Sequence, residues 1–282
     1  MKKHLSLLLM VSLLFSLAAC GGIQESSSTK DPAETSTEIF VFAAASMQES
    51  LNAAIEGYKS LAPEVTVVAT YDSSGTLLTQ IKEGAPCDLF ISAAPKQINA
   101  LDGTLIGNTE KNPDGLDMVV EGSRLNLLEN KVMLAVPEGN PAGIEAFDQL
   151  ADSLKNDDVM LAVGNSDVPV GQYTQKIFAY YEIDESAIAS KLTYGSNAKE
   201  VTTQISEGTV DCGIIYGTDA FSAGLTVVDE ATEAMCGGRV VYPAAVLKTA
   251  ANPLAAWDFL AFLQTDVCGE VFAAVGFTPL TN

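Results

Sequence analysis

The sequence has a single histidine, and that residue lies in a basic and apolar leader. His4 follows Met1-Lys2-Lys3 and precedes an apolar run, a combination typical of a secretory signal that is removed from the mature protein. The mature chain would then contain no histidine. This absence excludes Ser-His-Asp and Cys-His nucleophilic sites, and it also excludes histidine-based zinc and non-haem iron sites.

Positive charge is also scarce. The 282 residues include 15 lysines and arginines against 36 aspartates and glutamates, and the formal net charge is −21. Removal of the leader with Lys2 and Lys3 leaves 13 basic residues and a net charge of −23. Binding to nucleic acid needs a basic stripe, so we expect no nucleic-acid partner. The acidic composition favours solubility outside the cytoplasm.

Cysteine is sparse, and no C-x-x-C motif is present. Cys87 and Cys212 border apolar runs, so we expect them to be small core residues. Cys236 and Cys268 could form a disulfide outside the cytoplasm, but pairing cannot be deduced from spacing.

The start of the chain predicts a lipoprotein. Residues 1–19 form the expected signal peptide, whose apolar stretch is shorter than the roughly 20 residues of a membrane span. The run Leu17-Ala18-Ala19-Cys20-Gly21 resembles the bacterial lipobox, which implies that Cys20 becomes the lipid-modified first residue. Residues 20–37 are rich in serine, threonine and acidic residues and predict a flexible stalk. We expect an extracytoplasmic, cell-membrane lipoprotein; the alternative is a plain cleaved signal with an incidental cysteine.

After the stalk, short apolar runs alternate with segments of helical period. Such alternation is typical of a parallel sheet with crossover helices, so the predicted fold class is α/β. A break near 108–122 predicts two lobes, with residues 38–130 and 248–282 in lobe 1 and residues 131–247 in lobe 2. Ligands of open α/β sheets bind at the carboxyl ends of strands, which predicts a ligand cleft between the lobes. The expected strands are Ile39–Ala43, Val65–Tyr71, Leu89–Ser92, Val132–Val136, Met160–Val163, Gly213–Tyr216, Leu225–Val228 and Tyr242–Leu247.

Four junctions before predicted helices share one chemistry. A helix start presents unpaired N–H groups and partial positive charge, and both suit an anion. Ser46 and Glu49 also fit a capping box, in which the serine hydroxyl caps its own helix. Singly, each junction is more simply a cap, a turn or a solvated charge, but four in one cleft would form a cage of donors with little formal charge. The junctions are Ala44-Ala45-Ser46, Ser73-Ser74-Gly75, Val168-Pro169-Val170-Gly171 and Ser196-Asn197-Ala198-Lys199.

Motifs across nearly the whole mature chain resemble those of the periplasmic molybdate-binding proteins of ABC transporters. The resemblance implies the two-lobed type II periplasmic-binding-protein fold. It also implies that molybdenum is bound only as its oxyanion, through hydrogen bonds, with no direct protein–metal ligand and no cofactor. The motifs are Phe42-Ala43-Ala44-Ala45-Ser46, Ser73-Ser74-Gly75-Thr76-Leu77, Gly84-Ala85-Pro86-Cys87-Asp88-Leu89-Phe90-Ile91-Ser92-Ala93, Val168-Pro169-Val170-Gly171, Gly213-Ile214-Ile215-Tyr216-Gly217-Thr218-Asp219-Ala220 and Tyr242-Pro243-Ala244-Ala245-Val246.

The resemblance further implies which residues bind the oxyanion. Ser46 and Ser74 would donate from their hydroxyl and N–H groups, and Tyr216 would donate from its hydroxyl. Val170 and Lys199 would donate from their backbone N–H groups alone.

Two neighbouring residues leave the second serine and the ligand open. Ser73 could replace Ser74 as the donor if the register slips by one residue. Asp72, beside the serine turn, could accept a hydrogen bond from a protonated anion such as hydrogen phosphate, or it could point to solvent.

The expected function is that of a receptor. The resemblance implies a monomer that captures molybdate, and tungstate as well, and delivers it to an ABC permease without acting as an enzyme. A receptor for sulfate, phosphate or a small organic anion is the alternative within the same class. A hydrolase using Ser46 or Ser74 would need Lys199 as its base, because histidine is absent. An adhesin or structural lipoprotein would not need the four donor junctions.

Overall fold

The computed structural model describes residues 36–156 and 159–280. The predicted signal peptide at 1–19, the predicted lipid site at Cys20 and all but the last two residues of the predicted stalk lie outside the described residues. Within the described ranges, no helix is both long and apolar enough to cross a membrane.

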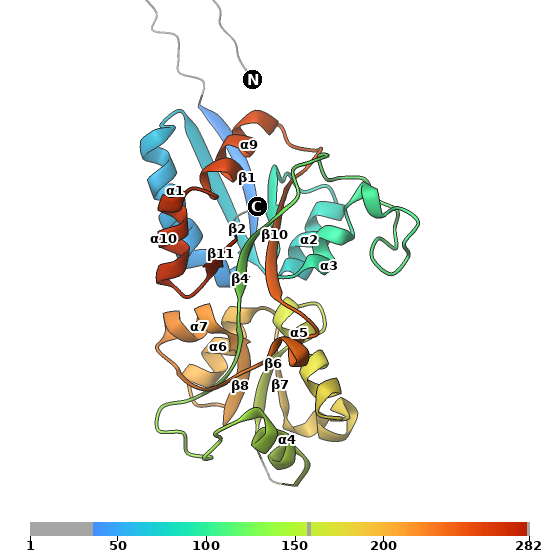
Figure 1. Cartoon of the computed structure of the whole chain (residues 1–282), viewed down its shortest axis with the longest axis vertical. Helices are drawn as coiled ribbons and strands as arrows, with labels where there is room; N and C mark the ends of the chain where they lie inside the picture. The colour runs from blue at the N-terminus through green and yellow to red at the C-terminus, as the bar shows by residue number, and fades with distance from the viewer. Residues whose placement is uncertain (1–35, 157–158, 281–282) are drawn as a thin grey trace, which may run out of the picture. The chain divides into compact units, whose positions relative to one another are not determined.

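A six-stranded sheet in the order β11-β4-β10-β3-β1-β2 forms the centre of what we call the first lobe. β1 pairs in parallel with β2 and β3, whereas β10 runs antiparallel between β3 and β4. Figure 1 shows helices on both sides of this sheet, α1 with α10 on one side and α2 with α3 on the other. The strands are β1 (Thr37–Ala44), β2 (Val65–Asp72), β3 (Leu89–Ile91), β4 (Leu125–Asn130), β10 (Val240–Val246) and β11 (Thr278–Pro279). The helices are α1 (Gln48–Leu61), α2 (Ser74–Lys82), α3 (Pro95–Asn99), α9 (Pro253–Phe262) and α10 (Asp266–Ala274), with short 3-10 turns at η1 (Ala45–Met47) and η2 (Gly103–Leu105).

A five-stranded sheet in the order β7-β6-β8-β5-β9 forms the centre of the second lobe. β6 is parallel to β7 and β8, and β5 is antiparallel to β8 and β9. The strands are β5 (Val132–Val136), β6 (Leu161–Gly164), β7 (Leu192–Gly195), β8 (Cys212–Tyr216) and β9 (Thr226–Glu230). The helices are α4 (Phe147–Asn156), α5 (Pro169–Tyr180), α6 (Ala198–Ser206), α7 (Gly217–Ala223) and α8 (Glu233–Cys236), with a 3-10 segment at η3 (Glu185–Lys191).

The sheets correct the predicted limit between the lobes. The sequence placed 131–247 in one lobe, but β10 pairs with β3 and β4 of the six-stranded sheet. The chain therefore leaves the first lobe at Lys131, between β4 and β5, and returns after β9 and before Val240. Chain order alone places β10 after the second series of strands, whereas its pairing partners come from residues more than a hundred positions earlier.

The sheets are also mixed and not wholly parallel. The chain leaves the first lobe through β4 and returns to it through β10, so these two neighbouring strands run in opposite directions (Figure 1). The strands that are followed by crossover helices, such as β1 and β6, keep the predicted parallel pairing.

Buried apolar strands supply the core of both lobes. In β1, Ile39, Val41 and Ala43 are fully buried, and in β8 Ile214 and Ile215 are fully buried. Strands covered by helices on both faces read as continuous apolar runs, which is why the sequence revealed them. Burial of each large aliphatic side chain contributes roughly 1.5–3 kcal/mol.

The described cysteines are part of that core. Cys87, Cys212, Cys236 and Cys268 are all buried and free, so Cys236 and Cys268 do not form a disulfide in this structure. Burial raises the pKa of Cys87 and Cys212 to about 12 and that of Cys236 to about 11, which keeps these thiols protonated at neutral pH.

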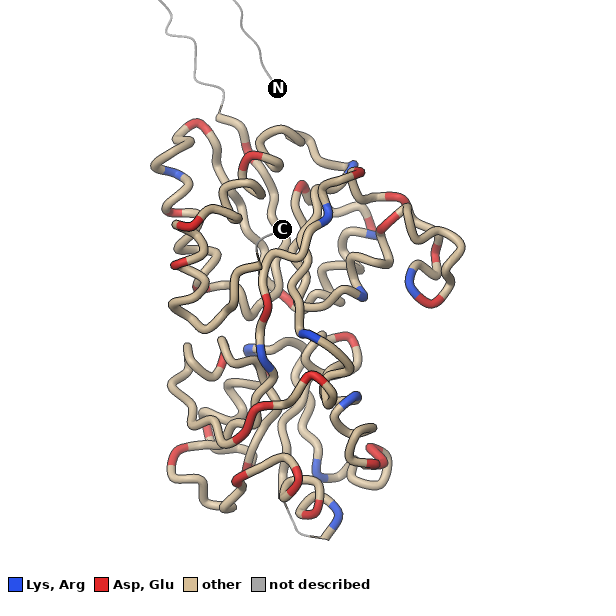
Figure 2. The backbone as a smooth tube through the Cα atoms, in the orientation of Figure 1, with Lys and Arg blue, Asp and Glu red and all other residues tan. Residues whose placement is uncertain are grey.

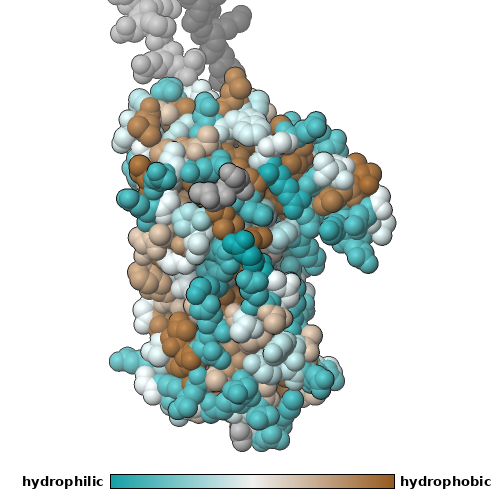
Figure 3. Space-filling model, in the orientation of Figure 1, coloured by the Kyte–Doolittle hydropathy of each residue, from teal (hydrophilic) through white to brown (hydrophobic). Residues whose placement is uncertain are grey.

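The surface reflects the acidic composition. Figure 2 shows acidic residues spread along both lobes and far fewer basic ones. On the face shown in Figure 3, small groups of apolar residues alternate with hydrophilic ones.

Candidate anion-binding site

The four predicted junctions meet around one small pocket between the lobes. Its volume is about 10 Å³, close to the roughly 10–15 Å³ that one water molecule needs. Each junction contributes, and so do Tyr216 at the end of β8 and the segment after β3. The lining residues are Ala44, Ala45, Ser46, Asp72, Ser73, Ser74, Ala93, Val168, Pro169, Ala198 and Tyr216.

Ser46 lines this pocket, but it does not cap a helix. The turn η1 separates β1 from α1, so α1 begins at Gln48 and its N-cap residue is Met47, which makes no side-chain cap. The predicted capping box with Glu49 is therefore wrong, because the 3-10 turn moves the helix start beyond Ser46. The Ser46 Oγ instead lies 2.9 Å from the hydroxyl oxygen of Tyr242 on β10.

The two serines at the start of α2 have different roles. Ser73 is the N-cap, and its Oγ accepts the Thr76 N–H at 3.0 Å. The Ser74 Oγ accepts the Ala93 N–H at 3.0 Å, and the side chain is fully buried. A hydroxyl that accepts one hydrogen bond still has its own proton to donate. Ser74 therefore fits the donor role better than Ser73 does.

The Asp72 carboxylate forms a hydrogen bond within the turn that precedes α2. Its Oδ1 accepts the Ser73 N–H at 2.6 Å, and the residue lines the pocket. The carboxylate thus stabilises the start of α2 and does not simply point to solvent. It is the one acidic residue among those lining the pocket.

Val170 and Lys199 are each one residue beyond the pocket lining. Pro169 and Ala198, the first residues of α5 and α6, line the pocket, whereas the Val170 side chain is buried in the core. N–H groups in the first turn of a helix have no intrahelical acceptor. In the part of the chain that the structure describes, no side chain accepts the Val170 or Lys199 N–H. Neither side chain lines the pocket, so any contribution of these two residues to it would come from their backbone N–H groups.

Two glycines allow close packing beside the pocket. A Cβ on Gly171 would lie 2.2 Å from the Asn165 carbonyl oxygen, so this glycine lets α5 pack on its own preceding loop. A Cβ on Gly75 would lie 2.2 Å from the Asp167 carbonyl oxygen. Gly75 belongs to the first lobe and Asp167 to the second, so the absence of a side chain at Gly75 permits the lobes to close.

Tyr216 also joins the two lobes. It is the last residue of β8 and is 1% exposed, and its hydroxyl donates to the Ala93 carbonyl at 3.4 Å. Its ring packs edge-on against those of Tyr173 and Tyr242, with centroids 6.4 and 5.6 Å apart. Burial raises the pKa of Tyr216 well above its usual value, so its hydroxyl remains a donor at neutral pH.

The structure adds two residues to which the sequence assigned no role. Tyr242 meets the Ser46 hydroxyl and also accepts from Asn130 Nδ2 at 3.1 Å. The same Asn130 amide donates to the Thr218 hydroxyl at 3.0 Å. Tyr242 lies within one of the motifs behind the resemblance, but its contact with Ser46 depends on the sheet order, which the sequence does not give.

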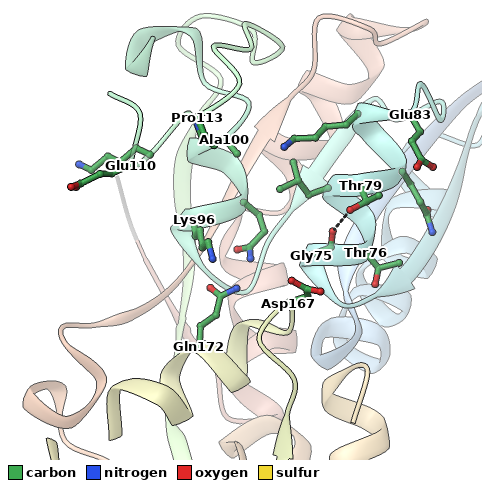
Figure 4. Close-up of a pocket in the computed structure, with 15 residues that line it drawn as sticks. Gly75, Thr76, Thr79, Glu83, Lys96, Ala100, Glu110, Pro113, Asp167 and Gln172 are labelled. Carbon is green, nitrogen blue, oxygen red and sulfur yellow. Dashed lines mark hydrogen bonds between the residues drawn. The ribbon is translucent and has the colours of Figure 1, made fainter. Parts of the chain in front are cut away.

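A larger hollow lies next to this pocket and has a different character. It has a volume of about 550 Å³, and Figure 4 shows Asp167 and Gln172 from the second lobe facing Gly75 and Lys96 from the first. Its lining includes the exposed carboxylates Glu83 and Glu110 as well as the basic residues Lys82, Lys96 and Lys111. It does not form a dry cage of donors.

The small pocket has the chemistry of an oxyanion site. Hydroxyl-bearing residues and the first residues of α5 and α6 line it, and no lysine or arginine does. Among the described residues, no cluster of three or more His, Cys, Asp or Glu side chains could hold a metal ion. Nor is a Ser–Lys pair formed there, because Ser46 bonds to Tyr242 and the Lys199 Nζ lies 3.0 Å from Glu49.

The chain belongs to the family of bacterial extracellular solute-binding proteins, which it matches over residues 39–278. Members of this family are non-enzymatic components of transport systems, so the chain is a binding protein and not a hydrolase.

Two relatives are similar over most of their length. YvgL of Bacillus subtilis, whose name assigns it provisionally to the substrate-binding lipoproteins of ABC transporters, is 29% identical over 279 residues, or 98% of each chain. The molybdate-binding protein ModA of Haemophilus influenzae is 29% identical over 248 residues, 86% of this chain and 91% of that one.

Solved structures show the same fold at lower identity. The periplasmic molybdate-binding protein of Azotobacter vinelandii has a TM-score of 0.69 at 18% identity, with 86% of this chain and 100% of that chain covered. The sulfate-binding protein SubI of Mycobacterium tuberculosis has a TM-score of 0.67 at 19% identity, with 86% and 87% covered. These likenesses confirm the two-lobed α/β fold.

Proposed function

We propose that this protein is the substrate receptor of an ABC importer and that it binds molybdate, and tungstate with it. The observation that carries the proposal is the meeting of four backbone junctions and Tyr216 around one pocket without a cationic lining residue. The ModA relative supports the choice of molybdate.

The donor set suits a fully ionised tetrahedral oxyanion, which can only accept hydrogen bonds. Ser46, Ser74 and Tyr216 offer hydroxyl protons, and the starts of α5 and α6 offer the N–H groups of Val170 and Lys199. Hydrogen bonds to a charged acceptor are worth roughly 1.5–3 kcal/mol each. About five to seven of them reach micromolar affinity after the cost of ordering the site.

Access to the pocket requires the lobes to separate. The pocket volume of about 10 Å³ is too small for an anion of five heavy atoms, and the Tyr216 hydroxyl closes it against the Ala93 carbonyl. A bound oxyanion would take the place of that carbonyl as the acceptor for Tyr216. Binding would thus exchange a contact between the lobes for two contacts through the ligand, one to each lobe.

The same proposal covers the cellular setting. The lipobox resemblance at Cys20 and the name of the YvgL relative support a lipid anchor in the cell membrane. A membrane permease is then the partner that receives the anion, and the receptor acts as a monomer with one pocket.

Isothermal titration of the purified protein with molybdate, tungstate, sulfate and phosphate tests the proposed ligand. We expect heat and a stoichiometry of one anion per chain with molybdate and tungstate, and at least 100-fold weaker binding of the other two. Tight binding of hydrogen phosphate would instead give Asp72 the role of hydrogen-bond acceptor for the protonated anion. Tight binding of sulfate would overturn the choice of molybdate.

A further inference from the structure

Asp219 is a fully buried carboxyl group beside the candidate site. Its side chain is 0% exposed, and in the described part of the chain neither carboxyl oxygen has a hydrogen-bond partner. Lys199 Nζ lies 3.7 Å from Oδ1, which is beyond hydrogen-bond distance. A buried carboxylate without donors is costly, so this environment favours the protonated acid.

The side chain of Lys199 is shared between carboxyl groups of the two lobes. Its Nζ lies 3.0 Å from Oε1 of Glu49 on α1, in the first lobe, and Asp219 is on α7, in the second. When the lobes separate, Glu49 moves away with α1 and Lys199 keeps Asp219 as its partner. Separation therefore favours ionised Asp219, and closure favours protonated Asp219.

The charge of Asp219 reaches the donors of the pocket. Burial is the main cause of the raised pKa of Tyr216 and Tyr242, and ionised Asp219 raises both further. The Tyr242 hydroxyl lies 2.9 Å from the Ser46 Oγ. By the same electrostatic interaction, a doubly charged oxyanion held by Ser46 and Tyr216 would repel the negative charge of ionised Asp219. Two negative charges close together disfavour each other, so the bound anion further favours the protonated acid.

The titratable groups around α7 are few. The strand β5 and the turn η1 contribute none, and Glu200 of α6 is exposed and accepts the Ser196 N–H. Burial raises the pKa of Asp219 to about 7, Lys199 lowers it and Glu49 raises it. The titratable groups on the elements around α7 are Lys199 and Glu200 on α6, Glu49 on α1, Cys212 and Tyr216 on β8, and Tyr242 on β10.

We propose that Asp219 makes anion binding proton-coupled: the protein takes up one proton, on this carboxyl, as it closes over a doubly charged oxyanion. This inference rests on the proposed function, because it assumes that the pocket binds a dianion. Atoms and charge balance, since one solvent proton is added to the carboxylate oxygen of Asp219 and no other bond changes.

The direction of the pH effect follows from the carboxyl group. The pKa of about 7 belongs to the closed protein without an anion, and it falls when the lobes separate. Below the pKa of the open protein, Asp219 is already protonated, so binding takes up almost no proton. Above that pKa, binding must first protonate Asp219, and the affinity falls by up to tenfold for each pH unit. Between pH 6 and pH 8 the affinity for molybdate should decrease by at least about tenfold.

Calorimetry with molybdate in two buffers of different ionisation enthalpy measures the proton uptake directly. At pH 8 we expect close to one proton per anion, and fewer at pH 6. The variant D219N should take up no proton at either pH, and its affinity should not change between them. Asp211, a partly exposed aspartate of the same lobe that accepts the Met160 N–H, gives the matched control D211N, which should behave as wild type.

A second variant tests the same coupling without altering the carboxyl group. K199Q removes the cation that stabilises ionised Asp219 in the open protein, so the loss of affinity should move to higher pH. If D219N does not fold, the pH dependence of molybdate affinity in K199Q tests the coupling in its place. Binding of molybdate without proton uptake at pH 8, or unchanged uptake in D219N, would overturn the inference and leave the proposed function intact. Absence of any molybdate binding would instead overturn the proposed function.

Discussion

The two walls of the pocket, one from each lobe, differ in whether side chains or backbone groups face the ligand site. The first lobe presents side chains, the hydroxyl groups of Ser46 in the 3-10 turn after β1 and of Ser74 at the start of α2. The second lobe presents mainly backbone, the first turns of α5 and α6, and adds the single hydroxyl of Tyr216. Residue identity therefore matters on the first wall, whereas on the second wall chain direction matters more than residue identity.

The largest effect on this comparison should come from preventing the two walls from meeting. A Cβ at Gly75 would lie 2.2 Å from the Asp167 carbonyl oxygen of the other lobe, so G75A blocks closure. We expect an affinity loss of about 100-fold by titration calorimetry, with little change in the thermal stability of the unliganded protein. The control is G57A, whose Cβ would make only an ordinary 3.6 Å contact with Phe262. Normal binding by G75A would show that the walls need not meet.

A smaller loss should follow removal of a hydroxyl from the first wall. S46A deletes a donor to the charged ligand, so the affinity should fall by about 10- to 100-fold. The matched control is S50A, because Ser50 is buried nearby and, among the described residues, its hydroxyl donates to the Met47 carbonyl. If both variants bind alike, Ser46 is part of the packing and not of the ligand site.

Tyr216 tests the one side-chain donor of the second wall. Y216F keeps the ring packing against Tyr173 and removes the hydroxyl, so we expect an affinity loss of about tenfold. The remote buried tyrosine at position 58, packed on Phe259, provides the control Y58F. An unchanged dissociation constant for Y216F would restrict the second wall to backbone donors.

The smallest effects should come from side-chain changes at the backbone donors. V170A and K199A keep their N–H groups, so at pH 6 each should change the affinity by less than about threefold. V170A should still lower the stability by about 1 kcal/mol, because it removes buried methyl groups from the core. Melting temperature and calorimetry on the same samples separate the two effects. A tenfold loss in V170A would remove the distinction between the walls.

Most secondary structure could be predicted from the sequence, because buried strands read as apolar runs. The expected strand at 132–136 coincides with β5, and the strands expected at 39–43 and 65–71 lie within β1 and β2. β4, β7 and the two-residue β11 were missed. In β4 the run Leu125-Asn126-Leu127-Leu128-Glu129-Asn130 neither alternates nor stays apolar, so neither strand pattern applies.

The site was predictable in its parts and only partly in its contacts. The motifs at the predicted helix starts identified the four chain segments that line the pocket. Three features depended on the tertiary structure: the pairing of β10 with β3, the Tyr242 hydroxyl beside Ser46, and the 3-10 turn that displaces the start of α1. Local sequence does not give the order of strands in a sheet, so it could not give the two contacts of β10. The 3-10 turn was missed because the capping-box pattern at Ser46 and Glu49 predicted a helix start at Ser46.

The paired crossing strands have a mechanical consequence. β4 and β10 are neighbouring strands of the six-stranded sheet, and only their paired ends at Asn130 and Val240 form a two-stranded ribbon where the chain crosses between the lobes. The register of the pair shifts between Tyr242 and Pro243. A ribbon bends readily in one direction and resists the others, so the lobes would swing along a single path instead of sampling many orientations. Tyr242 places one end of the Ser46 contact on β10. A membrane partner would then need to recognise only the spacing of the two outer surfaces to distinguish a filled receptor from an empty one.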